Sequence, residues 1–300
     1  MTPDPRSIIQ DAGLESATVE RFETLSERHG HAVWRVVTGD HSYVLKWLGG
    51  GHGRVEVEGY RLLQELGVPT LPLYGSSDEA LVLEDLTRSD TWRLAAEADS
   101  AQARVGRAVA RWYRLFHDAG ETLLSQGSPP SFLERETDVL DPETVLLMGR
   151  ALGLADLPVW ALAADHVELL KGAAARLSLT LNYNDFYWTN LALSRREARG
   201  LRAIVFDYHL LGMGMRYSDV RNVRFSLTGA AVPAFDEAYG SLDPREQTLD
   251  RPLATLHNLH TALRMADFPS WARHSRERVI SGDLERDLRE AVALSGALLE

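Results

Sequence analysis

Cysteine is absent from this chain of 300 residues. Its absence excludes disulfide bonds, thiolate metal sites and cysteine nucleophiles. Long apolar runs are missing as well. The segment Met1 to Arg6 contains no apolar signal core, and no later stretch is long enough to span a bilayer. We therefore expect a cytoplasmic protein that has no membrane partner.

Two common binding fingerprints are also missing. No G-x-G-x-x-G motif occurs, which argues against a dinucleotide-binding Rossmann domain. No H-E-x-x-H motif occurs either. His257 and His260 have a helical spacing, but no third metal ligand is evident, so a structural role is the favoured interpretation for both.

The chain has no excess of positive charge. Its net charge is −11 and its pI is about 5.4, which argues against a nucleic-acid partner. Such a charge favours cationic substrates by electrostatic steering. However, residues 1–86 carry most of the excess, with 14 acidic and 7 basic residues. A solvated acidic surface is therefore the favoured interpretation.

Lysine is nearly absent. The chain has 32 Lys and Arg residues, and only Lys46 and Lys171 are lysines. A lysine kept in such a chain indicates a need for a compact ammonium instead of a planar guanidinium. Lys46 lies in the strand-like run His41 to Leu48 and resembles the Lys of the V-A-I-K strand, which reaches nucleotide phosphates. A surface Lys on an edge strand is the alternative. Lys171 is interpreted as a solvated surface residue.

A helix is predicted directly after this strand. Residues 54–66 have apolar positions near the helical period and stop at Gly67-Val68-Pro69. The Lys46 hypothesis requires a carboxylate here, and Glu56 and Glu58 are the two candidates. Glu56 shares the inward stripe with Tyr60, so Glu56 is favoured as the partner of Lys46. The alternative is that both glutamates are solvated.

The most informative segments are Leu181 to Asn190 and Ala203 to Tyr208. They contain Asp185, Asn190 and Asp207 in an order that phosphoryl transfer from ATP requires: an Asp that orients the acceptor hydroxyl, then an Asn and an Asp that hold Mg²⁺. The interval from Asp185 to Asn190 is that of H-R-D-x-x-x-x-N. Two apolar strands joined by a polar turn should bring Asn190 close to Asp207. An ordinary hairpin with two incidental acids is the alternative.

The order of elements indicates an α+β fold. Residues up to about 86 read as strands, one of them at 31–38, with one helix. Later residues are mostly helical, and the expected helices include 132–152 and 271–298, which differs from alternating βαβ units. We expect a nucleotide-binding lobe at 1–86 and a helical lobe with the catalytic loop and the acceptor site at 87–300. The junction, Glu84-Asp85-Leu86, resembles in its position the hinge of protein kinases, and that resemblance implies that its backbone binds adenine. Glu84 and Leu86 are therefore candidate nucleotide-binding residues, and a plain loop is the alternative.

Together these motifs resemble the aminoglycoside phosphotransferase and choline kinase group of small-molecule kinases. The resemblance covers residues 19 to 225 and includes a G-V-P segment, a long helix ending in Leu115-Phe116-His117, and a segment similar to I-D-W-x-x-x-G-x-G with a later Asp. The members of that last segment are Phe206, Asp207, Tyr208, Gly212, Gly214 and Asp219. In place of the family's H-G-D this chain has Tyr183-Asn184-Asp185, and in place of His-Pro it has Tyr187-Trp188.

The resemblance implies a two-lobed protein-kinase-like fold and an ATP- and Mg²⁺-dependent phosphotransferase that acts on an alcohol group. The acceptor would be a hydroxylated small molecule, cationic or not, and most similar to the aminoglycoside substrates. A choline- or homoserine-kinase-like metabolite kinase and a nucleotide-binding pseudokinase that acts as an interaction module are the alternatives. The resemblance assigns support of the catalytic loop to Asp219, for which a helix cap is the competing interpretation. Trp188 could stack on an acceptor or pack the loop.

Overall fold

The computed structural model describes residues 3–28, 30–39, 41–49, 53–127, 129–198 and 200–299. The chain divides into two compact units. The first, here called the sheet unit, comprises residues 1–119, 183–211 and 222–240, and the second, the helical unit, comprises 120–182, 212–221 and 241–300. Each unit combines three separate segments of the chain, whereas the expected lobes were two continuous ranges that meet near residue 86. The lobe boundary at residue 86 stays a prediction.

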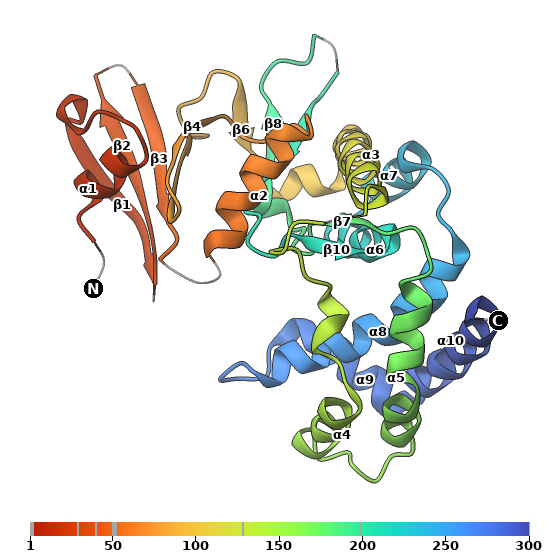
Figure 1. The fold of residues 1–300 in the computed structure, drawn as a ribbon. Coiled ribbons are helices and arrows are strands. Elements are labelled where there is room, and N and C mark those ends of the chain that lie inside the picture. The colour runs from red at the N-terminus through yellow and green to blue at the C-terminus, as the bar shows by residue number, and fades with distance from the viewer. Residues whose placement is uncertain are drawn as a thin grey trace. The chain divides into compact units, whose positions relative to one another are not determined.

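A five-stranded antiparallel sheet forms the N-terminal part of the sheet unit (Figure 1). Its strands lie in the order β1-β2-β3-β5-β4. Their bounds are β1 Arg21–Arg28, β2 His31–Thr38, β3 His41–Trp47, β4 Leu73–Ser76 and β5 Ala80–Glu84. Helix α2, Gly53–Glu65, follows β3. The predicted α+β class, with an antiparallel N-terminal sheet and a helical C-terminal region, is confirmed.

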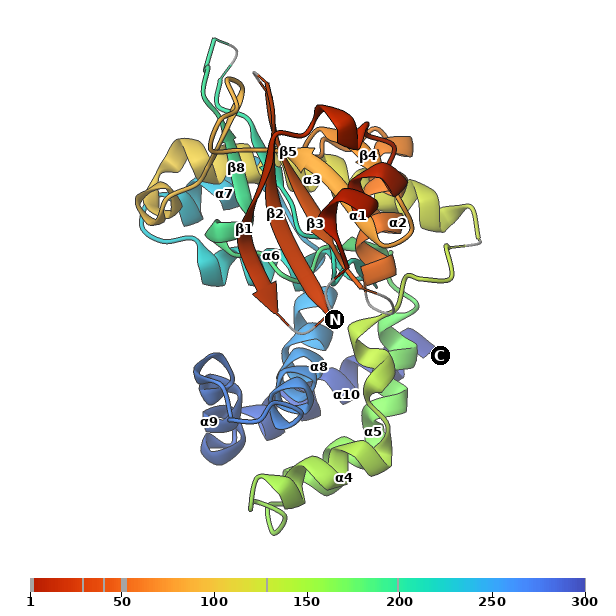
Figure 2. The same cartoon turned by 90° about the vertical axis from the view of Figure 1, so that its left-hand side faces the viewer.

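Side chains alternate between the two faces of this sheet. Trp34, Leu45 and Val82 are buried on one face against α1, Pro5–Asp11. Neighbouring residues such as Val33 and Val44 point to the opposite face, where they line a cavity. Figure 2 shows α1 over one face, and α2 lies on the other side of the strands in Figure 1. The period-two pattern thus gives the sheet one structural face and one face available for a ligand.

A second sheet in the sheet unit carries the predicted hairpin. Strand β8, Leu191–Ser194, pairs antiparallel with β9, Ala203–Val205, and Leu191 lies opposite Val205. The predicted hairpin is therefore confirmed. The third strand, β6 at Trp92–Leu94, was not predicted and pairs with β8. Helices α3, Ala103–Ser125, and α6, Arg216–Ser226, each run from one unit into the other, and α7, Ala231–Tyr239, belongs to the sheet unit.

The helical unit is built around α5 and α8. Its helices are α4 Pro142–Ala151, α5 Val159–Ala174, α8 Pro244–Leu263, α9 Arg273–Ser281 and α10 Asp283–Leu299. Trp160, Leu253 and Leu288 are among the buried residues of their shared core. A short antiparallel pair, β7 Thr180–Asn182 and β10 Gly212–Gly214, completes the unit.

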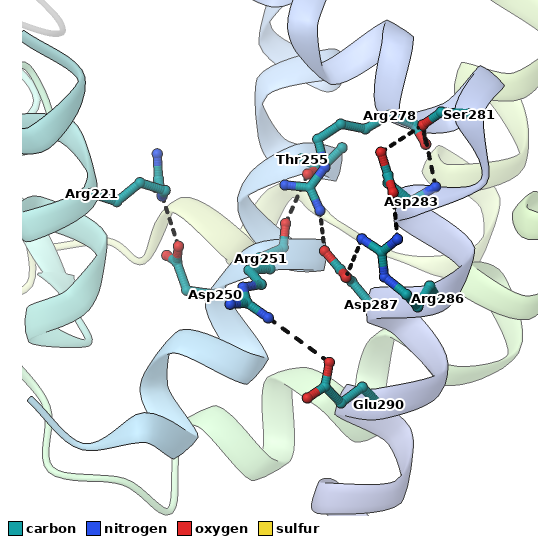
Figure 3. A network of polar contacts seen from close by, with 10 residues as sticks. All are labelled: Arg221, Asp250, Arg251, Thr255, Arg278, Ser281, Asp283, Arg286, Asp287 and Glu290. Atoms are coloured by element: carbon teal, nitrogen blue, oxygen red, sulfur yellow. Dashed lines mark hydrogen bonds and ion pairs between the residues drawn. The ribbon is translucent and has the colours of Figure 1, made fainter.

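Arginine–carboxylate pairs connect the helices of the helical unit. Figure 3 shows Arg221 on α6 bound to Asp250 on α8 at 2.7 Å, and Arg278 on α9 bound to Asp287 on α10. Asp250 and Asp287 are both buried, so these pairs hold charge within the unit. Breaking a buried pair by removing one partner is strongly destabilising, because it leaves an uncompensated charge.

Two predicted helices were too long. The predicted helix at 132–152 begins only at α4, where Asp141 caps the helix and accepts from the Thr144 N–H at 2.7 Å, and Pro142 occupies the first turn. The predicted helix at 271–298 is broken into α9 and α10 at Gly282, whose φ of 83° ends a helix. Within the described residues, no helix is long and apolar enough to cross a membrane.

Two glycines at helical positions give a test of the packing. In Gly106→Ala, a Cβ on α3 would lie 2.1 Å from the Ala231 carbonyl oxygen of α7, whereas a Cβ at Gly172 on α5 would meet nothing within 4 Å. We expect Gly106→Ala to lower the free energy of unfolding by about 1–3 kcal/mol. Gly172→Ala should raise it by about 0.5–1 kcal/mol, because alanine favours the helix. Urea unfolding measures both values, and equal effects would contradict the close approach of α3 to α7.

Candidate active site

Lys46 lies at the centre of a charge cluster in the sheet unit. Its ammonium is 2.6 and 2.8 Å from the two carboxylate oxygens of Glu56 and 2.8 Å from Oδ1 of Asp207. The three side chains come from β3, from α2 and from the loop after β9. The structure places Glu56 against Lys46, whereas Glu58 faces Arg61 at 3.5 Å. One cation thus joins elements that are far apart in the sequence.

The charges of this cluster support one another. Burial opposes ionisation of Lys46, but the charges of Glu56 and Asp207 outweigh burial and raise the pKa of the lysine. Burial also opposes the ionised form of Asp207, yet the hydrogen bond with His209 and the charge of Lys46 keep its pKa well below the usual value. Burial raises the pKa of Glu56, and Lys46 opposes that shift.

Asp185 and Asn190 are held together within their loop. The Asn190 amide donates to Asp185 Oδ2 at 2.9 Å and to the Asp185 carbonyl oxygen at 3.3 Å. The Asn190 carbonyl oxygen accepts from the Phe206 N–H at 3.1 Å, which joins the loop to the residue before Asp207. Burial raises the pKa of Asp185, and nearby Asp207 adds to this effect, whereas His209 and the bond from Asn190 counter it.

The two unusual loop residues have specific structural tasks. Tyr183 is fully buried, and its hydroxyl donates to the Phe206 carbonyl oxygen at 2.5 Å. Burial raises the pKa of Tyr183 far above its usual value, and a hydrogen bond with Asn190 opposes the shift. Asn184 has a φ of 66°, and Asn is one of the few residues other than glycine that tolerates this region. Asp207, with a φ of 71°, shares this conformation, so both acidic loops contain a strained position.

A cavity of about 290 Å³ opens beside Lys46 on the free face of the sheet. Apolar side chains form most of its walls, among them Val33, Val44, Leu83 and Phe206. The charged residues Lys46, Glu56 and Asp207 also line it, as do the predicted junction residues Glu84 and Leu86. A mostly apolar cavity with a few convergent polar groups is typical of a binding site for a small molecule or cofactor.

A second cavity of about 390 Å³ shares Lys46, Glu56 and Asp207 with the first and contains residues that the sequence analysis missed. Arg28 and His31, from the ends of β1 and β2, line this cavity together with His209. His209 Nδ1 lies 3.0 Å from Asp207 Oδ1, and this contact raises the pKa of the histidine. Two features of the sequence could have identified these residues. His209 follows Asp207 by two positions, and Arg28 and His31 flank the turn between β1 and β2.

Asp219 lies in the helical unit and is fully buried. It accepts from the Asn182 amide at 3.4 Å, and the same amide donates to the Met215 carbonyl oxygen at 3.0 Å. A Cβ at Gly214 would lie 2.3 Å from Asn182 Oδ1, which explains the glycine at this position. Asp219 therefore helps to hold the β7–β10 pair, and β7 ends directly before Tyr183 in the chain.

Three further predicted residues can be placed. The interpretation of Lys171 as solvated was wrong, because its side chain is only 19% exposed and donates to the Leu140 carbonyl oxygen at 2.7 Å. His257 faces Glu136 at 3.8 Å, and no group of three or more His, Asp or Glu side chains suited to a metal ion occurs in the described part of the chain. Trp188 packs against Tyr187 with ring centroids 5.7 Å apart.

The conformation of Asn184 gives a second test. Its amide donates to the Leu210 carbonyl oxygen at 3.1 Å, so Asn184→Gly and Asn184→Val both lose this bond. The valine variant should be less stable than the glycine variant by about 1–2 kcal/mol, because a left-handed conformation costs that much for a residue with a Cβ. Thermal and urea unfolding of the pair measure the difference. Equal stabilities would show that residue 184 does not adopt a positive φ.

No protein-family model and no curated protein sequence matches this chain. Solved structures do match it across nearly its whole length. A choline/ethanolamine kinase family protein from Mesorhizobium loti is 14% identical, with 96% of this chain and 98% of that chain covered and a TM-score of 0.58. A putative fructosamine-3-kinase from Thermobifida fusca is 17% identical, with 96% and 97% covered and a TM-score of 0.57.

A third match is spectinomycin phosphotransferase, solved in complex with ADP and spectinomycin. It is 10% identical, with 99% of this chain and 98% of that chain covered and a TM-score of 0.52. Identities this low show the fold alone. The resemblance seen in the sequence motifs is thus confirmed at the level of the fold: this chain has the protein-kinase-like fold of the small-molecule kinases.

Proposed function

We propose that this protein transfers the γ-phosphoryl group of ATP to a hydroxyl group of a small molecule. The observation that carries the proposal is the shared contact of Lys46 with Glu56 and Asp207 at 2.6–2.8 Å, beside a cavity of about 290 Å³ with largely apolar walls. Phosphoryl transfer depends mainly on positioning and on charge stabilisation, and these residues provide both. The phosphotransferase fold of the matched structures supports the same conclusion.

Each residue of the cluster has a role in this proposal. Lys46 contacts the α- and β-phosphates, and Glu56 holds the ammonium in place. Asp185 orients the acceptor hydroxyl and takes up its proton. Its hydrogen bond from Asn190 at 2.9 Å fixes the carboxylate for that task. The backbone of Glu84 and Leu86 binds the base.

Asn190 and Asp207 are the residues that would hold Mg²⁺. Magnesium in nucleotide sites is usually bound by one or two carboxylates together with substrate phosphates, so a preformed all-protein cage is not needed. The low pKa of Asp207 keeps its carboxylate ionised, which suits a hard cation. When bound, Mg²⁺ would neutralise charge that develops on the phosphates.

The second cavity contains side chains that can take the place of a glycine-rich phosphate-binding loop, which this chain lacks. Arg28 and His31 place basic side chains at the end of the β1–β2 hairpin, in the cavity that also contains Lys46. In this proposal they supply side-chain donors to the phosphates, where a glycine-rich loop would supply backbone N–H groups. The triphosphate would then lie in the second cavity and the base in the first.

The proposal extends to the acceptor and to the parts of the chain that bind it. We propose an aminoglycoside-like hydroxylated substrate, with choline- and homoserine-like metabolites as alternatives, bound by the region after residue 86. Residues 1–86 would form the nucleotide lobe, and Asp219 would support the catalytic loop through Asn182. The reaction would take place in the cytoplasm, where ATP and Mg²⁺ are plentiful.

A nucleotide-binding pseudokinase is the second candidate. The observation that favours it is the replacement of the common loop residues by Tyr183, Asn184, Tyr187 and Trp188. Against it, Tyr183 and Asn184 preserve the loop through a hydrogen bond and a tolerated backbone conformation. The two candidates differ in whether any acceptor supports turnover.

The test of function is ATP turnover with Mg²⁺ across a panel of hydroxylated acceptors. Asp185→Asn should lower the rate by about 10²–10⁴-fold, because it removes the group that positions and deprotonates the hydroxyl. Nucleotide affinity and melting temperature should stay close to those of the wild type. Turnover that survives in the variant would refute the role of Asp185. Nucleotide binding without turnover on any acceptor would establish the pseudokinase alternative.

The pair Lys46–Glu56 is tested with a matched control on the same helix. Glu56→Gln and Lys46→Arg should each reduce kcat/KM at least tenfold, because the first removes the charge that holds the ammonium and the second replaces a compact cation with a planar one. Their effects should be non-additive in a double-mutant cycle. Glu58→Gln should leave kcat/KM within about twofold of wild type, since Glu58 faces Arg61. Additive losses, or an equal loss in Glu58→Gln, would contradict the assigned pair.

A further inference from the structure

Arg35 is an unexpected residue in the wall of the first cavity. It lies on β2 between residues of the ligand-facing side of the sheet, and Val33 and Val44 beside it are apolar. Its side chain is only 17% exposed. An apolar residue would fill this position of the strand without the cost of removing a guanidinium from water.

The guanidinium of Arg35 makes three different contacts. Nε donates to Asp85 Oδ2 at 2.7 Å, one terminal nitrogen donates to Glu23 Oε2 at 3.0 Å, and the other donates to the Thr87 hydroxyl at 2.9 Å. The fork therefore connects β1 and β2 to the segment after β5. A planar guanidinium presents its N–H donors in fixed, separate directions, which suits a link between three different partners.

Asp85, the carboxylate partner of Arg35, accepts several further hydrogen bonds. Its side chain is 2% exposed, and Oδ2 also accepts from the Ser42 hydroxyl at 2.7 Å. Oδ1 accepts from the Thr87 N–H at 3.1 Å and from the Thr87 hydroxyl at 2.7 Å. Both oxygens are thus used, one for the link to the sheet and one for the local turn. Burial opposes ionisation of Asp85, but these hydrogen bonds keep its pKa below the usual value.

A second arginine, directly after the end of β8, holds the same segment. Arg195 donates to the carbonyl oxygens of Ser89 and Trp92 at 2.7 and 3.0 Å, and to that of Leu86 at 3.4 Å. The segment that follows β5 is therefore held from two sides by arginines that come from other parts of the chain. Of the two, only Arg35 lines the cavity.

Stability alone does not account for the Arg35–Asp85 pair. Replacing a buried ion pair by well-packed apolar residues is often neutral or stabilising, so a core position has no need of the pair. The pair fixes the distance between β2 and Asp85. It thereby also positions the two neighbours of Asp85, Glu84 and Leu86, relative to the ligand-facing side of the sheet. These are the residues whose backbone is proposed to bind the base.

We propose that Arg35 and Asp85 are positioning residues for the nucleotide base. They hold Glu84 to Leu86 in the conformation that receives the base, and they act through that segment without contact with the phosphates. This inference rests on the proposed nucleotide-binding function and extends it. If the segment without the link spends only a tenth of its time in the competent conformation, base affinity falls tenfold.

The experiment compares wild type with the double variant Arg35→Met, Asp85→Asn. The asparagine keeps an oxygen for the Thr87 N–H, so the local turn is retained while the link to β2 is lost, and no buried charge of this pair is left unpaired. We expect the dissociation constant for ADP to rise about tenfold. The affinity for inorganic tripolyphosphate with Mg²⁺ should stay within twofold, because the phosphate contacts lie elsewhere. Isothermal titration calorimetry measures both ligands.

The control is Arg278→Met, Asp287→Asn in the helical unit. This pair has similar burial, with side chains 20% and 4% exposed against 17% and 2% for Arg35 and Asp85, and it lies outside both cavities. The control should shift the melting temperature and leave ADP affinity unchanged. An unchanged ADP affinity in the Arg35 variant, a parallel loss of tripolyphosphate affinity, or an equal loss of ADP affinity in the control would overturn the inference. A wild-type protein that binds neither ADP nor tripolyphosphate would refute the proposed function itself.

Discussion

The arrangement of the candidate site depends on the contacts that the partly buried ammonium of Lys46 makes with two carboxylates. Glu56 is 1% exposed and Asp207 is 31% exposed, and both carboxylates lie within 2.8 Å of the same nitrogen. Two carboxylates this close repel each other unless a cation lies between them, and the repulsion is stronger in a low-dielectric environment than in water. The cation therefore permits β3, α2 and the loop after β9 to meet. His209, 3.0 Å from Asp207, adds a second basic partner on the more exposed side.

The chain assigns different tasks to its two kinds of cation. Both lysines are only 19% exposed, and each presents its ammonium to oxygens at close range: Lys46 to two carboxylates, and Lys171 to a carbonyl and to Glu168. Arg35 and Arg195 act as forks that join several partners around the segment after β5. The compact ammonium of Lys46 suits a site that receives phosphates, and a planar guanidinium suits a link between several partners.

The departures of the loop from the common motif preserve its geometry by other means. Tyr183 connects its loop to the loop of Asp207 through the Phe206 carbonyl oxygen, and its ring is buried against Tyr208 with centroids 5.9 Å apart. Asn184 adopts the backbone conformation that a glycine would otherwise supply. A large aromatic residue and a polar one therefore replace a smaller pair, and the positions of Asp185 and Asn190 remain compatible with the proposed chemistry.

Much of the fold could be predicted from local patterns in the sequence. The strand of residues 31–38, the helix after Lys46 and the β8–β9 hairpin have clear periodicities, because each buries one face in a regular way. The helical periodicity also predicted that Glu56, and not Glu58, faces Lys46. By contrast, the three-residue strands β6 and β10 have no pattern long enough to recognise, and they exist because a partner strand satisfies their backbone.

The sequence by itself determined which residues could carry the chemistry, since residue type and spacing are local properties. Only the tertiary structure decided that Arg28, His31 and His209 share a cavity with Lys46, and that Arg35 meets Asp85 across 50 positions of the chain. Contacts between distant residues depend on the packing of whole elements, and no local period records them.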